Sequence, residues 1–173
     1  FSYGDYLRCG AMASTSPIMQ DVVKKANEGV PVLGICNGFQ ILIESGLLDG
    51  ALMRNNCLSF ICRDVLIKSK NKSSVFTRKS KLAKMPIAHN EGNFFATSEQ
   101  LKKIEGNDQI AFQYCDETGN VEQSSNPNGS LANIAGILNE NKNVLGMMPH
   151  PERAAEKIHG CDDGKIIFES IFN

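Results

Sequence analysis

The sequence predicts an α/β fold, with a doubly wound, mostly parallel sheet flanked by helices and a few antiparallel strands added. Three observations lead to this prediction. Helix-like and strand-like segments alternate along the chain, and a nearly continuous apolar run at residues 30–35 is typical of a strand buried on both faces. Short strand-like segments, one of them with period-two alternation, then fill the middle of the chain. The 173 residues suffice for one domain, and we expect a single domain over residues 1–173.

The first part of the chain predicts a helix, a strand and a second helix. Ser16 and Pro17 are typical of a helix start, and apolar residues then recur at helical spacing until Gly29. The apolar run at residues 30–35 predicts the buried strand. A second helix is expected over about residues 38–45, because a glycine follows it directly.

The remainder of the chain predicts strands separated by loops and two short helices. The expected strands cover residues 58–62, 64–67, 85–89, 93–96, 109–114, 133–138 and 143–148. One helix is expected to begin at Ser98, and a closing helix is expected from about residue 164 to residue 172. A polar loop between residues 116 and 130 ends in an Asn-Pro-Asn-Gly turn signal.

The charge balance and the hydropathy pattern exclude two classes of partner. The chain has 18 Lys and Arg against 19 Asp and Glu, whereas nucleic-acid-binding proteins usually carry a strongly basic surface. No apolar run approaches the roughly 18–20 residues of a membrane-spanning helix. We therefore expect neither a nucleic acid nor a membrane as a partner.

Cysteine usage indicates a reducing compartment. The six cysteines occur at positions 9, 36, 57, 62, 115 and 161. None forms a C-x-x-C pair, so no metal site is predicted, and the chain is large for a disulfide scaffold. We expect Cys57, Cys62 and Cys115 to be small buried hydrophobic residues and the protein to be cytoplasmic.

The most informative motif is a cysteine between two glycines at the end of the predicted buried strand. Gly34, Cys36 and Gly38 reproduce the G-x-S-x-G nucleophile elbow with sulfur in place of oxygen. Small residues are needed because such a turn packs strand and helix backbones closely together. A position at a helix N-terminus favours the Cys36 thiolate, and the backbone N–H of Asn37 is expected to face a developing oxyanion. Cys36 is therefore a candidate nucleophile.

His150 is the best candidate for the base that a cysteine nucleophile needs. It follows an apolar strand, and catalytic groups of open α/β sheets gather at that edge. Glu152 lies two residues further on and is expected to orient the imidazole ring. His159 lies in a polar segment, and His89 lies in a polar turn. Acyl transfer through a thioester follows, but spacing alone leaves a peptidase, an esterase-like hydrolase and an amidase open.

The segment Gly-Ile-Cys-Asn-Gly-Phe-Gln at residues 34–40 resembles the nucleophile motif of class I (triad) glutamine amidotransferases. More narrowly, the chain resembles the glutaminase subunits of phosphoribosylformylglycinamidine synthase, which act in purine synthesis. The segments that carry this narrower resemblance are residues 1–8, 47–55, 86–89, 126–130 and 143–153. The resemblance implies a flavodoxin-like amidotransferase fold.

The resemblance also implies an activity and a set of site residues. The subunit is expected to hydrolyse L-glutamine with Cys36 as nucleophile, His150 as base and Glu152 as orienting acid. Gln40 and the loop of His89, Asn90 and Glu91 are expected to contact glutamine, with Asn90 standing where relatives usually have glycine.

The same resemblance implies partners. Ammonia is expected to pass to a large synthetase subunit, with a small third subunit in the same complex. No cofactor or metal is expected in this subunit, because ATP and Mg²⁺ belong to the synthetase.

Two other readings stay open. One is a stand-alone Cys-His hydrolase or peptidase of similar α/β architecture. The other is a non-catalytic chain with an incomplete oxyanion hole. The resemblance implies that relatives carry a further β-α-β portion before residue 1, including glycines that supply a second oxyanion N–H. The chain is therefore expected to be N-terminally incomplete, with an exposed edge of its sheet.

Overall fold

The computed structural model of the protein describes residues 7–172, without the side chains of residues 7–9. Most of the motif at residues 1–8 and the side chain of Cys9 therefore lie outside the described part. Five α-helices are described: α1 (Leu7–Ser14), α2 (Pro17–Asn27), α3 (Asn37–Glu44), α4 (Ser98–Gly106) and α5 (Lys165–Ile171). None of these helices is long and apolar enough to cross a membrane.

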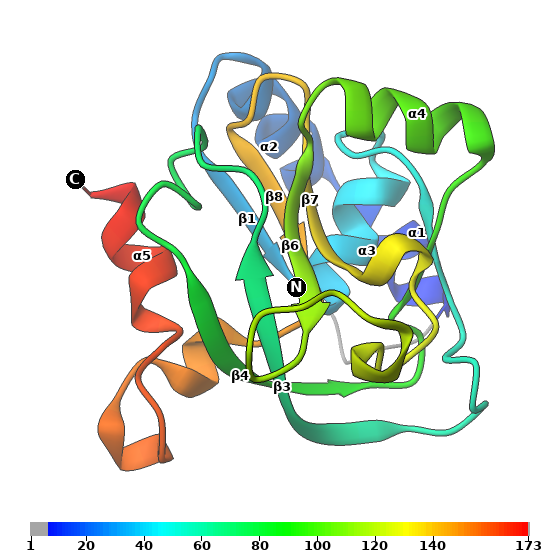
Figure 1. The fold of residues 1–173 in the computed structure, drawn as a ribbon. Coiled ribbons are helices and arrows are strands. Elements are labelled where there is room, and N and C mark those ends of the chain that lie inside the picture. Colours follow the sequence, from blue (N-terminus) through cyan, green and yellow to red (C-terminus); the bar gives the residue numbers. More distant parts are fainter. Residues whose placement is uncertain (1–6, 173) are drawn as a thin grey trace.

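The strands of the described residues form a six-stranded sheet, whose strands are labelled in Figure 1, and a separate pair. The larger sheet has the order β1-β8-β7-β6-β3-β4, and β2 pairs with β5. The strands are β1 (Val32–Ile35), β2 (Ala51–Met53), β3 (Ile61–Ser69), β4 (Leu82–His89), β5 (Asn93–Phe95), β6 (Ile110–Cys115), β7 (Ile134–Leu138) and β8 (Val144–Met147). Helices thus pack against a mixed sheet in an α/β fold, which confirms the predicted fold class.

The share of antiparallel strands is larger than the sequence predicted. Within the described residues, β1 and β8 pair in parallel, whereas the other four pairings of the larger sheet are antiparallel. The expectation of a mostly parallel sheet is therefore wrong for this part of the chain. Short connections favour antiparallel pairing here. Only five residues separate β7 from β8, whereas a parallel pairing needs a crossover of roughly a dozen residues or more.

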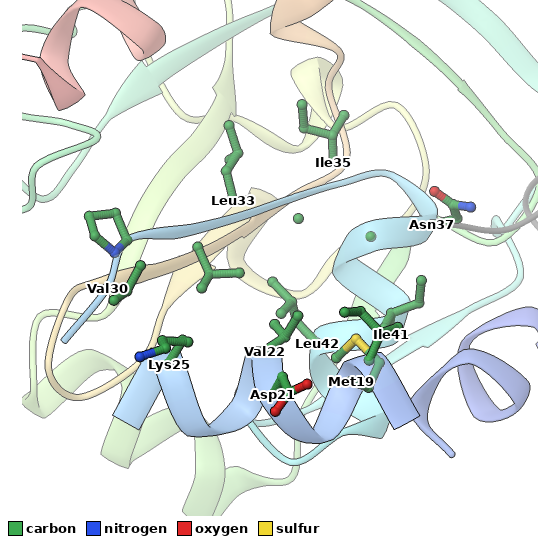
Figure 2. A pocket seen from close by; sticks show the side chains of 15 residues that line it. Met19, Asp21, Val22, Lys25, Val30, Leu33, Ile35, Asn37, Ile41 and Leu42 are labelled. Carbon is green, nitrogen blue, oxygen red and sulfur yellow. The ribbon is translucent and has the colours of Figure 1, made fainter. Parts of the chain in front are cut away.

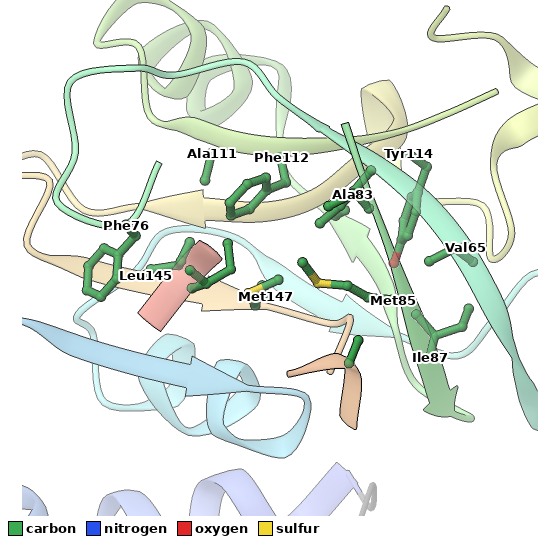
Figure 3. Packing of buried hydrophobic residues seen from close by; sticks show 14 of the residues in the cluster. Val65, Phe76, Ala83, Met85, Ile87, Ala111, Phe112, Tyr114, Leu145 and Met147 are labelled. Atoms are coloured by element: carbon green, nitrogen blue, oxygen red, sulfur yellow. The ribbon is translucent and has the colours of Figure 1, made fainter. Parts of the chain in front are cut away.

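The core lies on both faces of the sheet, which explains the continuous apolar runs in the sequence. One cluster packs beneath α5 and contains Phe76, Tyr114, Leu145 and Met147 (Figure 3). The other cluster packs beneath α2, α3 and α4. Within β8, Val144 belongs to one cluster and Leu145 and Met147 belong to the other, because neighbouring side chains of a strand point to opposite faces. The strand is therefore apolar throughout.

The sheet curls so that its two outer strands meet at one end. The strands β1 and β4 are at opposite ends of the strand order. Nevertheless, the Sγ atom of Cys36, directly after β1, lies 3.8 Å from the carbonyl oxygen of Ala88 in β4. The backbone N–H of His150, which follows β8, donates to the carbonyl oxygen of Pro86 in β4 at 2.9 Å. The curl thus brings the residues that follow β1 and β8 into contact with β4.

Other local predictions are confirmed or corrected by the structure. The helix expected after Ser16 is α2, although the Ser16 hydroxyl donates to the carbonyl of Ala13 and does not cap the helix. Residues 58–60 are not a strand, because Leu58 has a φ of 55°, which no strand accommodates. Cys115 is buried as expected, but Cys57 and Cys62 are exposed. Cys57 lies in the loop before β3, and Cys62 lies at the exposed start of that strand.

Candidate active site

Cys36 occupies a strained turn between β1 and α3. Its backbone has φ 53° and ψ −108°, a conformation that non-glycine residues rarely adopt. The turn is fixed from the sheet side, since the backbone N–H of Cys36 donates to the carbonyl of Met147 at 2.8 Å. Such strain at a buried thiol is the geometry of a nucleophile elbow.

Gly34 allows the close approach of strand and helix at this turn. A Cβ atom at Gly34 would lie 2.7 Å from the carbonyl oxygen and 2.8 Å from the carbonyl carbon of Gly38. A Cβ atom at Gly38 would meet no described atom within 4 Å. The steric need inferred for both glycines therefore falls on Gly34, whose missing side chain makes room for the Gly38 backbone.

Asn37 is the first residue of α3, with Cys36 as its N-cap. The backbone N–H groups at the start of a helix point toward the N-terminal end and carry its positive partial charge. The position of Asn37 next to the nucleophile is the one that an oxyanion donor requires.

His150 and Glu152 form a hydrogen-bonded pair. The Nδ1 atom of His150 lies 2.6 Å from Oε1 of Glu152, and Nε of Arg153 lies 3.6 Å from the same oxygen. Partial burial raises the pKa of Glu152, but the hydrogen bond and charge of His150, together with Arg153, bring the pKa below its ordinary value. The carboxylate therefore stays ionised and accepts the Nδ1 proton of the ring.

The position of the proton on His150 leaves its other ring nitrogen, Nε2, able to accept a proton. With Nδ1 donating to Glu152, the neutral ring has its lone pair on Nε2. This atom is buried and has no hydrogen-bond partner among residues 7–172. No hydrogen bond joins it to the Cys36 thiol in the described structure, so proton transfer between the two stays a prediction. His159, in contrast, is exposed on a 3₁₀ turn.

The loop after β4 lies against the nucleophile and Gln40. Gln40 is buried in α3, and its Nε2 atom donates to the carbonyl of Glu91 at 3.5 Å. A cavity of about 20 Å³, enough for one water molecule, is bordered by Gln40 and Glu91. His89 is fully buried, and Asn90 accepts a backbone hydrogen bond from Asn55. The structure therefore brings Cys36 and Gln40 against residues 88–91, and it bonds the backbone of His150 to the same strand, β4.

Two buried asparagines that sequence reasoning missed hold this loop. Asn55 contacts His89 and Gly92, and Asn128 donates from Nδ2 to the carbonyl of Gly92 at 2.8 Å. Asn128 belongs to a segment that the sequence identified as a turn signal and as part of the family resemblance, without a structural role for this side chain. Its burial inside the fold, with Ser130 beside it, was not visible from the turn pattern alone.

A separate groove of about 660 Å³ lies between α2 and β1. Met19 and Val22 of α2 face the strand across it (Figure 2). Of the site residues expected from the sequence, it is lined by Asn37, at its end. Its apolar lining does not suit the polar groups of glutamine, so we do not assign it to the substrate. Within residues 7–172, no group of three or more His, Cys, Asp or Glu residues is placed to hold a metal ion.

Comparisons with known proteins identify the family of the chain. Residues 1–161 match the family model of the CobB/CobQ-like glutamine amidotransferase domain. The chain is 57% identical to phosphoribosylformylglycinamidine synthase subunit PurQ of Chlorobium luteolum, over 99% of this chain and 76% of that protein. It is 55% identical to the subunit of the same name from Pelagibacter ubique, over 100% of this chain and 77% of that protein.

A solved structure extends the similarity to three dimensions. The structure of PurLQS from Thermotoga maritima aligns with a TM-score of 0.83 and 43% identity, over 100% of this chain and 75% of that chain. The chain therefore resembles this family in its curled α/β sheet as well as in its sequence. The chain belongs to the CobB/CobQ-like glutamine amidotransferases and, within them, to the PurQ subunits of phosphoribosylformylglycinamidine synthase.

Proposed function

We propose that this enzyme is the glutaminase subunit of phosphoribosylformylglycinamidine synthase, which hydrolyses L-glutamine and supplies ammonia for purine biosynthesis. One observation carries the proposal beyond family membership. A buried cysteine in a strained strand-to-helix turn directly follows β1, the strand that pairs in parallel with β8, and β8 leads to the His150–Glu152 pair. This arrangement suits acyl transfer by a cysteine nucleophile.

The first half of the reaction forms a thioester. His150 accepts the thiol proton of Cys36 at Nε2, and the sulfur attacks the carboxamide carbon of glutamine. The backbone N–H of Asn37 stabilises the oxyanion, a contribution that typically amounts to about 10²–10³ in rate. The C–N bond then breaks, and the leaving nitrogen takes the proton from His150 and departs as ammonia.

The second half restores the enzyme. A water molecule gives a proton to His150 and attacks the thioester carbon. The C–S bond breaks, glutamate leaves, and the proton returns to the Cys36 sulfur. Glu152 keeps the imidazole in one orientation and stabilises its cationic form in both halves.

Glutamine binding is proposed at the junction of α3 and the loop after β4. Gln40, His89, Asn90 and Glu91 surround this place, and the carbonyl groups of Ala88 and Glu91 already face Cys36 and Gln40. Polar groups that converge on a small space suit the two polar ends of an amino acid.

The proposal includes partners and a location. Its partners are a large synthetase subunit, which uses ATP and Mg²⁺, and a small third subunit, while this subunit uses no cofactor. The names of the relatives support the partnership, since each is called a synthase subunit. We further propose a cytoplasmic location, and Cys57, Cys62, Cys115 and Cys161, which form no disulfide within the described residues, suit a reducing compartment.

The test measures ammonia release from L-glutamine, with and without the synthetase subunits. We expect low activity for the isolated subunit, a rise in the complex and a loss in Cys36→Ala. Cys62→Ala is the matched control, because Cys62 is exposed on β3 and should leave the activity unchanged. Full activity in Cys36→Ala would contradict the mechanism. Hydrolysis of peptides or esters in preference to glutamine would favour a stand-alone hydrolase.

A further inference from the structure

We propose that Asn55 is a positioning residue that holds His89 in its Nδ1–H tautomer and thereby fixes the loop at residues 89–92 beside the nucleophile. The assignment of the tautomer rests on geometry alone. The consequence for glutamine binding rests on the proposed function.

The amide group of Asn55 has a single orientation that satisfies its neighbours. Asn55 is fully buried, and its Nδ2 atom donates to the carbonyl oxygens of Ser59 and His89, each at 2.9 Å. Its Oδ1 atom accepts from the backbone N–H of Gly92 at 3.2 Å. Exchange of the two ends would place NH₂ against an N–H group and an oxygen against two carbonyls. The orientation of Asn55 is therefore determined by backbone groups that cannot change their roles.

This orientation determines where the proton of His89 lies. The Nδ1 atom of His89 is 3.0 Å from Oδ1 of Asn55. Since that oxygen can only accept, Nδ1 must donate, and the neutral ring has its lone pair on Nε2. The His89 side chain is fully buried, so its ring cannot turn freely to another partner. The contact with Asn55 thus leaves Nε2 of His89 as a hydrogen-bond acceptor.

The ring is also held in place by packing. A Cβ atom at Gly92 would come within 2.6 Å of three ring atoms of His89, so the imidazole lies directly on the Gly92 backbone. The backbone N–H of Asn55 donates to the carbonyl of Asn90 at 2.9 Å. On the other side, Asn128 donates to the carbonyl of Gly92. The loop is therefore held from both sides by buried asparagines.

The loop position matters because it borders the reacting groups. The carbonyl oxygen of Ala88, directly before the loop, lies 3.8 Å from the Cys36 sulfur, and the carbonyl of Glu91 accepts from Gln40. A shift of this loop would move groups on both sides of the place where glutamine is proposed to bind.

The first experiment determines the tautomer by ¹⁵N NMR of the full chain with labelled histidine. The chain has three histidines, and the His89 signals are assigned by their loss in His89→Gln. We expect His89 to have a protonated Nδ1 and an unprotonated Nε2 near neutral pH. An Nε2–H tautomer or a cationic ring would overturn the proposal.

The second experiment separates positioning from general stability. Asn55→Ala should convert the His89 signals to a mixture of tautomers and raise KM for glutamine in the complex roughly tenfold, with a smaller change in kcat. Asn71→Ala is the matched control, because Asn71 is another fully buried asparagine that organises a different loop. It should lower Tm while leaving the His89 tautomer and KM unchanged.

The outcomes are distinguishable. Equal KM values in Asn55→Ala and Asn71→Ala, in a complex that releases ammonia, would overturn the positioning role. A wild-type complex that releases no ammonia would contradict the proposed function, while the NMR result would still decide the tautomer of His89.

Discussion

Replacement of Gly34 by alanine is expected to disturb the turn that presents Cys36. The new Cβ atom would lie 2.7 Å from the Gly38 carbonyl oxygen and 2.5 Å from a methyl group of Leu42. The Leu42 side chain can rotate away, but the Gly38 backbone is part of α3 and cannot. Because ordinary contacts need about 3.5 Å, the start of α3 has to move by roughly 1 Å.

The size of the effect follows from this overlap. Overpacking of this kind costs about 1–3 kcal/mol, and a chain of this length loses about 2–4 °C in Tm for each kcal/mol. The Tm of Gly34→Ala should therefore fall by roughly 2–12 °C. A misplacement of about 1 Å at the nucleophile should also lower glutamine hydrolysis by about 10². Thermal unfolding followed by circular dichroism and an ammonia-release assay measure the two effects.

A second glycine provides the control for this substitution. Gly106 ends α4, and a Cβ atom there would meet no described atom within 4 Å. Gly106→Ala should keep full activity and an equal or higher Tm, because alanine is favoured over glycine in helices by about 0.5–1 kcal/mol. If Gly34→Ala behaved like Gly106→Ala in both assays, the steric account of the elbow would be refuted.

Three other predictions concern the surroundings of the site. Glu152→Gln should lower glutamine hydrolysis by roughly 10²–10⁴, because the neutral amide no longer stabilises the cationic imidazole and its NH₂ group can hold the ring in the wrong tautomer. The pKa of Glu152 in the folded protein lies below its ordinary value of 4.5. The ionised carboxylate therefore stabilises the fold at pH values above 4.5, and this stabilisation is lost as the pH falls through the folded pKa. The difference in Tm between the wild type and Glu152→Gln should disappear over the same pH range. Gly92→Ala should raise KM for glutamine and lower Tm, because its methyl group displaces the His89 ring; an unchanged KM would contradict the role of the loop. Cys57 should react with a thiol reagent in the native protein faster than Cys115, whose thiol is buried and has a raised pKa; similar rates would contradict the described burial.

Local sequence patterns predicted the helix starts and the elbow because those features depend on neighbouring residues. Pro17 begins α2, and the spacing of Gly34 and Cys36 anticipated a turn whose strain the structure then showed. The same reasoning predicted too much parallel pairing, since strand direction depends on connection lengths that apolar runs do not reveal. It also placed Cys57 and Cys62 in the interior, because a cysteine alone does not tell which side of a strand or loop faces solvent.

The residues that hold the site were hidden from local patterns for a different reason. Asn55 and His89 are 34 positions apart and come together only because the loop after β2 packs against the end of β4. Asn128 likewise reaches Gly92 across 36 positions. A buried asparagine has no periodic signal, so its role appears only once the sheet has curled and its hydrogen-bond partners are known.

Covalent labelling tests the identity of the nucleophile most directly. A glutamine analogue with an electrophilic carbon in place of the carboxamide carbon is added to the wild-type complex, and the modified residue is identified by peptide mass spectrometry. The chain offers six cysteines, so the site of labelling is informative. We expect one label, on Cys36, that excess L-glutamine prevents. Labelling of another cysteine in place of Cys36, or labelling that glutamine does not prevent, would contradict the assignment of Cys36 as the glutaminase nucleophile.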